Sequence, residues 1–175
     1  MLYVARHGQS IWNAKNKVCG ITDVELTETG RLQAEKLARE VQKYDIHFLL
    51  SSSLKRAVET SNIISEICNI PMATDERLVE QNYGIYEGVD RKDDAFIKNK
   101  KCFAYKYPNG ESMMQVAYRV YGMLDEIKQK HGDKNVLIIS HGGVCRIINT
   151  YFNDMTNEEF FNYTLGNATL RSYEW

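Results

Sequence analysis

Three short apolar runs constrain the fold of this chain most strongly. They are Leu2–Ala5, Phe48–Leu50 and Val136–Ile139, and they lack the polar alternation of a half-exposed strand. Continuous apolar runs of this length predict strands that are buried on both faces. Ile70–Ala73 is a weaker fourth candidate, and Ala168–Trp175 is expected at an edge of the sheet.

Amphipathic helices are expected between these strands. Thr27 can cap a helix in which apolar residues recur at i, i+3, i+4 and i+7 from Ala34 to Val41. Ser51–Ser53 is expected to cap a second helix, whose apolar face runs from Leu54 to Ile67. Further helices are predicted over Glu111–Lys130 and from Gly142 to Tyr151. Strands that alternate with helices predict an α/β fold, with a mostly parallel sheet covered on both faces.

Length and charge narrow the class of protein. The 175 residues fit one domain, so residues 1–175 are predicted to form a single domain. Lys plus Arg (22) nearly balance Asp plus Glu (23), which argues against a basic surface for nucleic acid. No apolar run approaches the roughly 20 residues of a membrane span, and the N-terminus does not resemble a signal peptide. We expect a cytoplasmic protein with no nucleic-acid or membrane partner.

Cysteine and histidine spacing gives no indication of a metal site. Cys19, Cys68, Cys102 and Cys145 are far apart and form no CxxC pair, so we expect free and mostly buried thiols in a reducing compartment. The four histidines show neither HxH nor HExxH spacing. We therefore expect no metal and no cofactor. His47 and His131 are interpreted as structural or exposed residues.

The segment Asp90–Lys106 has no place in the alternation of strands and helices. It contains six basic residues among aromatic ones. This composition is typical of a surface helix or a lid, and residues 90–110 are a candidate lid or cap. A solvated charged face and a substrate-facing role are both open interpretations.

Polar residues that bind anions follow three of the predicted strands. Arg6-His7-Gly8 follows the first strand, Ser51–Arg56 the second, and Ser140–Gly143 the strand at Val136–Ile139. Ligands bind at the carboxyl ends of parallel strands, so these residues are expected at one edge of the sheet. Arginine forks match phosphate oxygens, helix N-termini add N–H donors, and a histidine can donate or attack phosphorus. The predicted ligand is a phosphoryl group.

Other phosphate chemistries lack their motifs in this sequence. There is no GxxxxGK[ST] loop, no cysteine followed by arginine six positions later, and no DxD pair. The stretch Gly8–Trp12 resembles GxSxG but lacks the last glycine, which disfavours a serine hydrolase. A metal-free histidine mechanism remains.

An ordered set of motifs resembles the histidine phosphatase superfamily, the phosphoglycerate mutase-like proteins. The set covers essentially the whole chain, and its order is far more specific than the Arg6-His7-Gly8 triplet alone. Its members are Arg6–Asn13, Gly20, Asp23–Gly30, Ser51–Thr60, Leu78–Glu80, Tyr83-Gly84, Glu87-Gly88, Pro108–Ser112 and Ser140–Gly143. The resemblance implies a three-layer α/β/α fold with a mostly parallel sheet and an antiparallel edge strand.

The same resemblance implies a role for each site residue. His7 would attack phosphorus and become phosphohistidine, and Glu80 would protonate the leaving oxygen and then activate water. The remaining site residues, Arg6, Asn13, Arg56 and His141, would bind the phosphoryl oxygens. Glu80 and Asn13 come from the resemblance alone. Gly20 and Tyr83 are not assigned as ligand contacts.

Three functions are compatible with this set of residues. They are a phosphatase, a phosphoglycerate mutase-type phosphotransferase and an inactive phosphate-binding regulatory module. The inactive module is disfavoured because the whole predicted catalytic set is present. Glu80 is followed by Gln81-Asn82, where mutases carry an arginine and a histidine, and Asp90–Lys106 offers mainly lysines in place of paired arginines. The chain is also short for a mutase, so we favour a phosphatase.

The substrate is expected to be a small phosphomonoester, and the lysine-rich segment would suit an anionic one. Short members of the family that this chain resembles include alpha-ribazole phosphatases and broad-specificity phosphatases. The sequence does not determine which ester is used or the oligomeric state.

Overall fold

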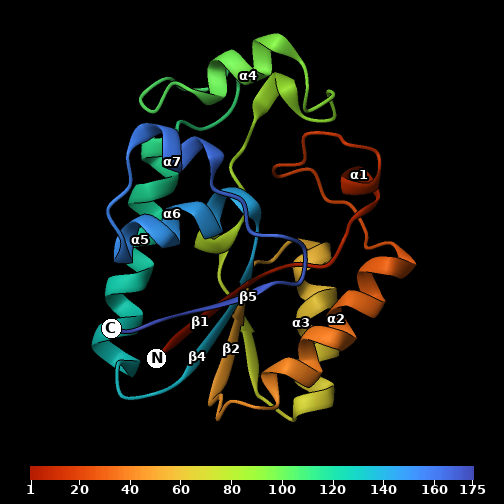
Figure 1. Ribbon diagram of the computed structural model, residues 1–175, viewed down its shortest axis with the longest axis vertical. Coiled ribbons are helices and arrows are strands. Elements are labelled where there is room, and N and C mark those ends of the chain that lie inside the picture. The colour runs from red at the N-terminus through yellow and green to blue at the C-terminus, as the bar shows by residue number, and fades with distance from the viewer.

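A five-stranded sheet lies between two layers of helices in the computed structural model, which describes residues 1–175 (Figure 1). The strand order is β3-β2-β4-β1-β5, and every neighbouring pair is parallel except β5, which is antiparallel to β1. The predicted α/β fold with an antiparallel edge strand is therefore confirmed. The strands are β1 (Leu2–Arg6), β2 (Phe48–Ser51), β3 (Met72–Thr74), β4 (Val136–Ser140) and β5 (Leu170–Tyr173).

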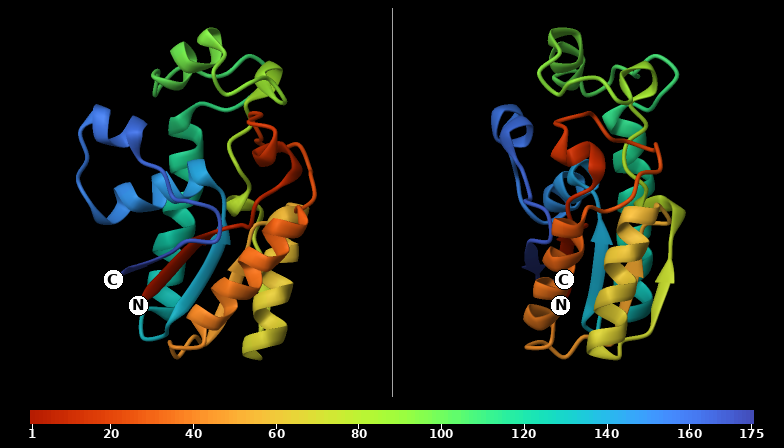
Figure 2. Two further views of the ribbon diagram at one scale, coloured as in Figure 1. Left: turned by 45° about the vertical axis from the view of Figure 1, so that its right-hand side comes forward. Right: turned by 90° about the vertical axis from the view of Figure 1, so that its right-hand side faces the viewer.

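Helices α2 and α3 cover one face of the sheet, and α5 and α6 cover the other (Figure 2). Helix α4 lies beyond one end of the sheet, and the two chain termini lie close together at the other end. The helices are α1 (Ile11–Ala14), α2 (Glu28–Val41), α3 (Lys55–Cys68), α4 (Asp94–Lys100), α5 (Met113–His131), α6 (Gly142–Phe152) and α7 (Asn157–Asn162), with short 3-10 helices η1 (Glu76–Leu78) and η2 (Gly84–Tyr86).

The central strands divide their side chains between two hydrophobic cores. In β1, Leu2 and Val4 pack in the core under α5 and α6, whereas Tyr3 and Ala5 pack in the core under α2 and α3. Strand β4 alternates in the same way. Because successive side chains of a strand point to opposite faces, a strand covered on both sides needs apolar residues at every position. This explains the continuous apolar runs of the sequence.

Two of the predicted helix starts differ from the structure. The start predicted for α2 is confirmed: Thr27 caps this helix, since its hydroxyl accepts from the Gly30 N–H at 3.0 Å. The predicted cap of α3 at Ser51–Ser53 is wrong, because α3 follows Leu54 and the Lys55 N–H donates instead to Asp23 Oδ1 at 2.8 Å. Helix α5 begins at Met113 rather than at Glu111, because Ser112 and Gln115 form a capping box there. Ile67, expected on the buried face of α3, is 41% exposed because it lies in the last turn of the helix.

The remaining sequence predictions concern isolated side chains and the basic segment. All four cysteines are free; Cys19 and Cys145 are buried, but Cys102 is exposed, against expectation, because it follows α4 at the surface. His47 is exposed, and the His131 ring packs against Phe48 with 4.8 Å between ring centroids. Asp90–Lys106, for which a surface helix and a lid were both open, contains the helix α4. None of the helices has the length and apolar character needed to cross a membrane.

Replacing Leu37 of α2 by alanine should test the packing of the helix layer on the sheet. Leu37 is 1% exposed, so Leu37→Ala should lower the free energy of unfolding by about 2–5 kcal/mol through lost burial and a residual cavity. Leu32 on the same helix is 57% exposed, so Leu32→Ala should cost no more than about 0.5 kcal/mol. Urea denaturation of both variants measures the difference. Equal losses would contradict the described orientation of α2.

Candidate active site

The pairing of β1 with β4 brings two histidines together. Arg6 lies opposite Ser140 in the parallel register, and the His7 N–H donates to the Ser140 carbonyl at 3.0 Å. Because both strands end at the same edge, the rings of His7 and His141 lie 5.0 Å apart between centroids. Both side chains are buried, at 2% and 0% exposure.

The hydrogen bonds of His7 assign its tautomer. Nδ1 lies 2.6 Å from the carbonyl oxygen of Gly8, which can only accept, so Nδ1 carries the proton. Nε2 is left with a lone pair, to which Arg56 Nε donates at 3.3 Å. Burial, followed by the positive charges of Arg56 and Arg6, lowers the pKa of His7 well below its usual 6.5. The imidazole is therefore neutral near pH 7.

Backbone carbonyls, rather than carboxylates, hold the two arginines beside His7. Arg56 is fully buried and donates to the carbonyls of Gly20 at 2.6 Å and Thr22 at 3.0 Å. Arg6 donates to the Leu165 carbonyl at 3.1 Å, and its Nε has no hydrogen-bond partner. Burial and the charge of Arg91 lower the pKa of Arg6. Since no carboxylate neutralises these guanidinium groups directly, their positive charge is available to an anion.

His141 presents one nitrogen to the protein and leaves the other unpaired. Its Nε2 lies 2.7 Å from the hydroxyl of Ser52, whereas its buried Nδ1 has no partner. Burial, and then the charges of Arg56 and His7, lower the pKa of His141 well below 6.5. Helix α6 begins immediately after this residue, at Gly142.

Glu80 carries the carboxylate of this site. It is 5% exposed, and its two oxygens accept from the Gln81 N–H and the Gly143 N–H, each at 2.9 Å. A Cβ atom at position 143 would lie 2.5 Å from Glu80 Oε1, so a glycine is required there for the carboxylate to approach the helix.

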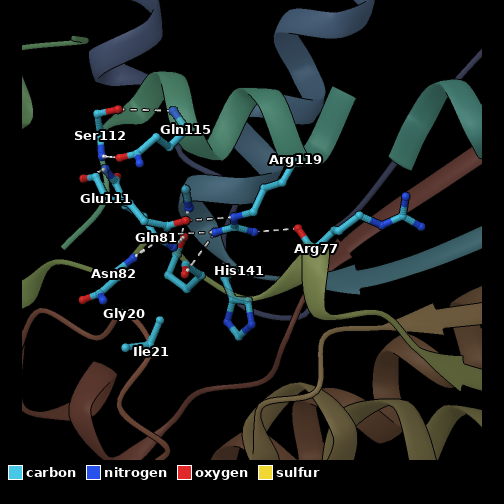
Figure 3. A network of polar contacts seen from close by, with 12 residues as sticks. Gly20, Ile21, Arg77, Gln81, Asn82, Glu111, Ser112, Gln115, Arg119 and His141 are labelled. Atoms are coloured by element: carbon cyan, nitrogen blue, oxygen red, sulfur yellow. Dashed lines mark hydrogen bonds and ion pairs between the residues drawn. The ribbon is translucent and has the colours of Figure 1, made fainter. Parts of the chain in front are cut away.

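Arg119 of α5 holds the chain segment from Arg77 to Asn82, which includes Glu80 (Figure 3). It donates to the Arg77 carbonyl at 2.6 Å and to the Glu80 carbonyl at 3.3 Å. It also binds both carboxylate oxygens of Glu111 at 3.1 Å, and Glu111 in turn accepts from the Asn82 N–H at 3.0 Å. One guanidinium thus fixes both ends of the segment that carries Glu80.

Asn13 is placed by a second network at the end of β1. Its Oδ1 accepts from the Ser10 N–H and from Asn167 Nδ2, each at 3.2 Å. Asn167 Nδ2 also donates to the His7 carbonyl at 2.9 Å. The amide oxygen of Asn13 is therefore occupied, and the adjacent amide nitrogen remains available as a donor.

These side chains surround one pocket of about 310 Å³. Arg6, His7, Asn13 and Glu80 line it, and Arg56 and His141 contact His7. All six predicted site residues therefore lie together. Tyr83, which the sequence analysis did not assign, also lines the pocket. The sequence analysis placed Ser52 at this edge without giving it a contact, and it did not identify three further polar residues of the site: Arg119, Arg146 and Asn167.

The pocket also has contributions from the basic segment and from the chain after α6. Phe96, Ile97, Lys100 and Lys101 of the α4 region line it, as do residues 161–165. No group of three or more His, Cys, Asp or Glu side chains is arranged to hold a metal ion.

Comparison with known proteins identifies the family. The sequence model described as the histidine phosphatase superfamily (branch 1) matches residues 2–175. The chain is 33% identical to the 2,3-bisphosphoglycerate-dependent phosphoglycerate mutase of Cytophaga hutchinsonii, over 100% of this chain and 87% of that protein. This chain belongs to the histidine phosphatase superfamily.

Solved structures of relatives share the fold. The mycobacterial glucosyl-3-phosphoglycerate phosphatase superposes with a TM-score of 0.86 at 25% identity, over 97% of this chain and 87% of that chain. The protein YhfR of Bacillus stearothermophilus superposes with a TM-score of 0.85 at 28% identity, over 97% of this chain and 88% of that chain. The family thus contains both phosphatases and mutases that resemble this chain.

The two buried histidines should titrate at low pH. His7 and His141 gain a proton only well below pH 6.5, because burial and neighbouring guanidinium groups disfavour the charged ring. Both should stay neutral as the pH falls from 8 through 6.5. NMR titration of the ring resonances, assigned with single histidine variants, measures this. A midpoint at or above 6.5 for His7 would contradict the geometry.

Removing the Arg119 guanidinium should loosen the Glu80 segment. Arg119→Gln leaves the Glu111 carboxylate and two carbonyls without their donor, which should destabilise the fold by about 1–3 kcal/mol. The Gln81 and Asn82 amides should then exchange at least about 10-fold faster with solvent. Lys128→Gln, at an exposed position of the same helix, is the control. Unchanged exchange rates in Arg119→Gln would contradict the role given to Arg119.

Proposed function

We propose that this protein is a phosphatase that hydrolyses a small phosphomonoester through a phosphohistidine on His7. The observation that carries the proposal is the state of the His7 ring. It is neutral and buried, its Nδ1 proton is donated to Gly8, its Nε2 lone pair accepts from Arg56 Nε, and the residue lines the cationic pocket. A neutral imidazole held this way is a nucleophile that needs no separate base.

In the first step, His7 Nε2 attacks phosphorus and the bond to the ester oxygen breaks. The carboxyl group of Glu80 gives its proton to the departing oxygen, so that an alcohol leaves rather than an alkoxide. Glu80 lines the same pocket as His7 and is the only carboxylate among the lining residues.

In the second step, water replaces the alcohol. The Glu80 carboxylate takes a proton from water, the water oxygen attacks phosphorus, and the P–N bond to His7 breaks. Inorganic phosphate leaves, and His7 and Glu80 return to their initial protonation states. The same carboxyl group thus serves as acid and then as base.

Four donors would stabilise the phosphoryl oxygens during both steps. Arg6 and Arg56 supply charge that no carboxylate partner neutralises, and Asn13 supplies its amide nitrogen. His141 supplies its unpaired Nδ1, which carries the ring proton when the Ser52 hydroxyl donates to Nε2. These groups are fixed before the substrate arrives, so little reorganisation accompanies the reaction.

Mutase activity is the second candidate, because a relative that is 33% identical over the whole chain is a phosphoglycerate mutase. The residues after Glu80 favour the phosphatase. Gln81 is 1% exposed and donates to the Glu111 carbonyl, and the Asn82 side chain accepts from the Gly84 N–H. Both amides are engaged in supporting the loop.

Two further proposals concern the surroundings of the site. Four unpaired thiols suit a reducing compartment, so we place the protein in the cytoplasm. Residues 90–110 would act as a cap, because the α4 region lines the pocket that also contains His7. The binding partner that we propose for the protein is a small phosphorylated substrate.

Phosphate release in excess EDTA tests the proposed function. Wild type should release phosphate from some members of a panel of phosphomonoesters that includes 3-phosphoglycerate, and His7→Ala should lose at least about 1,000-fold in kcat. His47→Ala, at an exposed histidine, should match wild type. Rapid quenching of wild type should also trap an acid-labile phosphoenzyme that His7→Ala lacks.

Each other result selects a different function. Equal release by wild type and His7→Ala would mean that His7 is not the nucleophile. Interconversion of 2- and 3-phosphoglycerate without net release of phosphate would indicate a mutase. Phosphate binding with neither reaction would indicate an inactive binding module, and loss of release in EDTA would contradict metal independence.

A further inference from the structure

The pocket contains more positive charge than one phosphoryl group requires. Besides Arg6, its lining includes four basic side chains, Arg91, Lys100, Lys101 and Arg146, against the single carboxylate of Glu80. A phosphate monoester carries about two negative charges near pH 7. Arg6 and Arg56 beside His7 suffice to balance that charge. The other cations therefore lack an anion.

Arg146 is the clearest case of an unpaired charge. It lies on α6 and is 7% exposed, and its Nε has no hydrogen-bond partner. Its guanidinium packs over the Phe160 ring at 5.2 Å, and no carboxylate lies within ion-pair distance. Burying an unpaired cation costs several kcal/mol, so such a residue is expected to meet an anion in the functional state.

Two other arginines near the site, Arg56 and Arg119, differ from Arg146. Arg56 donates to two carbonyls and to His7, and Arg119 donates to a carboxylate and two carbonyls. Their positions are explained by partners within the protein. Arg146 has an aromatic ring on one side and the pocket as the remaining place for an acceptor.

Lys100 of α4 lies close enough to Arg146 and Arg91 to be affected by their positive charges. Burial, and then the charges of Arg146 and Arg91, lower its pKa to about 8. Arg91 uses one nitrogen to donate to the Lys17 carbonyl at 3.0 Å and has further N–H groups free. Three cations from a loop, α4 and α6 thus repel one another in one part of the pocket. An anion among them would relieve that repulsion.

We propose that Arg146 and Lys100, together with Arg91, form a second anion subsite. The substrate is then a phosphomonoester that carries a second anionic group, a carboxylate or another phosphate. The proposal rests on the proposed function, and it adds the class of ester that the same pocket selects. The volume of about 310 Å³ is at the small end for ligand pockets, so both groups belong to a compact molecule.

Matched pairs of esters test the subsite. Phosphoserine differs from phosphoethanolamine by a carboxylate, 3-phosphoglycerate differs from glycerol 3-phosphate by a carboxylate in place of a hydroxymethyl group, and propane-1,3-diyl bisphosphate differs from propyl phosphate by a second phosphate. Wild type should have a kcat/KM at least about 10-fold higher for the doubly anionic member of at least one pair. The pair with the largest ratio identifies the second group.

Substitutions of Arg146 and Lys100 test whether these side chains cause the preference for the doubly anionic ester. For the preferred ester, Arg146→Gln and Lys100→Gln should each lower kcat/KM about 10- to 100-fold, mainly through KM, because a charge-assisted contact is lost. For its singly anionic counterpart, the change should stay below about 3-fold. Arg146→Lys should recover part of the loss because it keeps the charge. Lys98→Gln, which removes the same charge from an exposed position of α4, should match wild type.

Three results would overturn the subsite. They are equal kcat/KM for both members of every pair, an equal loss on both members in Arg146→Gln and Lys100→Gln, and an effect of Lys98→Gln as large as that of Lys100→Gln. If wild type hydrolyses none of the esters, the proposed function fails, and calorimetric binding of the same pairs tests the subsite separately. Tighter binding of the doubly anionic member that Arg146→Gln abolishes would still support it, and equal binding would overturn it.

Discussion

The parallel pairing of β1 with β4 is the constraint on which the site depends. It sets Arg6 opposite Ser140, so the residues that follow each strand, His7 and His141, emerge side by side at one edge. Burial on both faces fixes the register. A slip by one residue would move every side chain of the strand from one hydrophobic core to the other. The hydrophobic core and the histidine pair are therefore consequences of the same pairing.

A second constraint is the way in which positive charge is held at this edge. Arg56 and Arg6 are oriented by the carbonyls of Gly20, Thr22 and Leu165, which fix a guanidinium without cancelling its charge. Carboxylate partners would stabilise the empty protein more but would compete with an anionic ligand. The only carboxylate that lines the pocket, Glu80, accepts from backbone N–H groups instead. The site thus retains the charge that a phosphoryl group requires, at some expense of stability.

The sequence predicted the features that arise from local patterns, and it missed those that arise from packing between distant segments. Apolar runs gave the buried strands, and the residues directly after them gave His7, Arg56 and His141. Glu80 and Asn13 required the family resemblance, because neither follows a strand. The cap of α3 was wrong since its partner, Asp23, comes from 32 residues earlier in the chain. Arg146 was missed because an arginine inside an apolar helix gives no indication of which pocket it lines.

The two parts of the pocket are positioned by different elements. His141 and Arg146 lie at the start and in the second turn of α6, so a single buried helix fixes the spacing between the phosphoryl site and the second anion subsite that we propose. Lys100 comes instead from α4, which reaches the rest of the molecule through Phe96 packed against Tyr83 and Tyr107. In the subsite that we propose, changes in α4 would therefore alter which ester is preferred without moving the groups around His7. The proposed chemistry then depends on the sheet edge, and the proposed choice of substrate depends on α6 and α4 together.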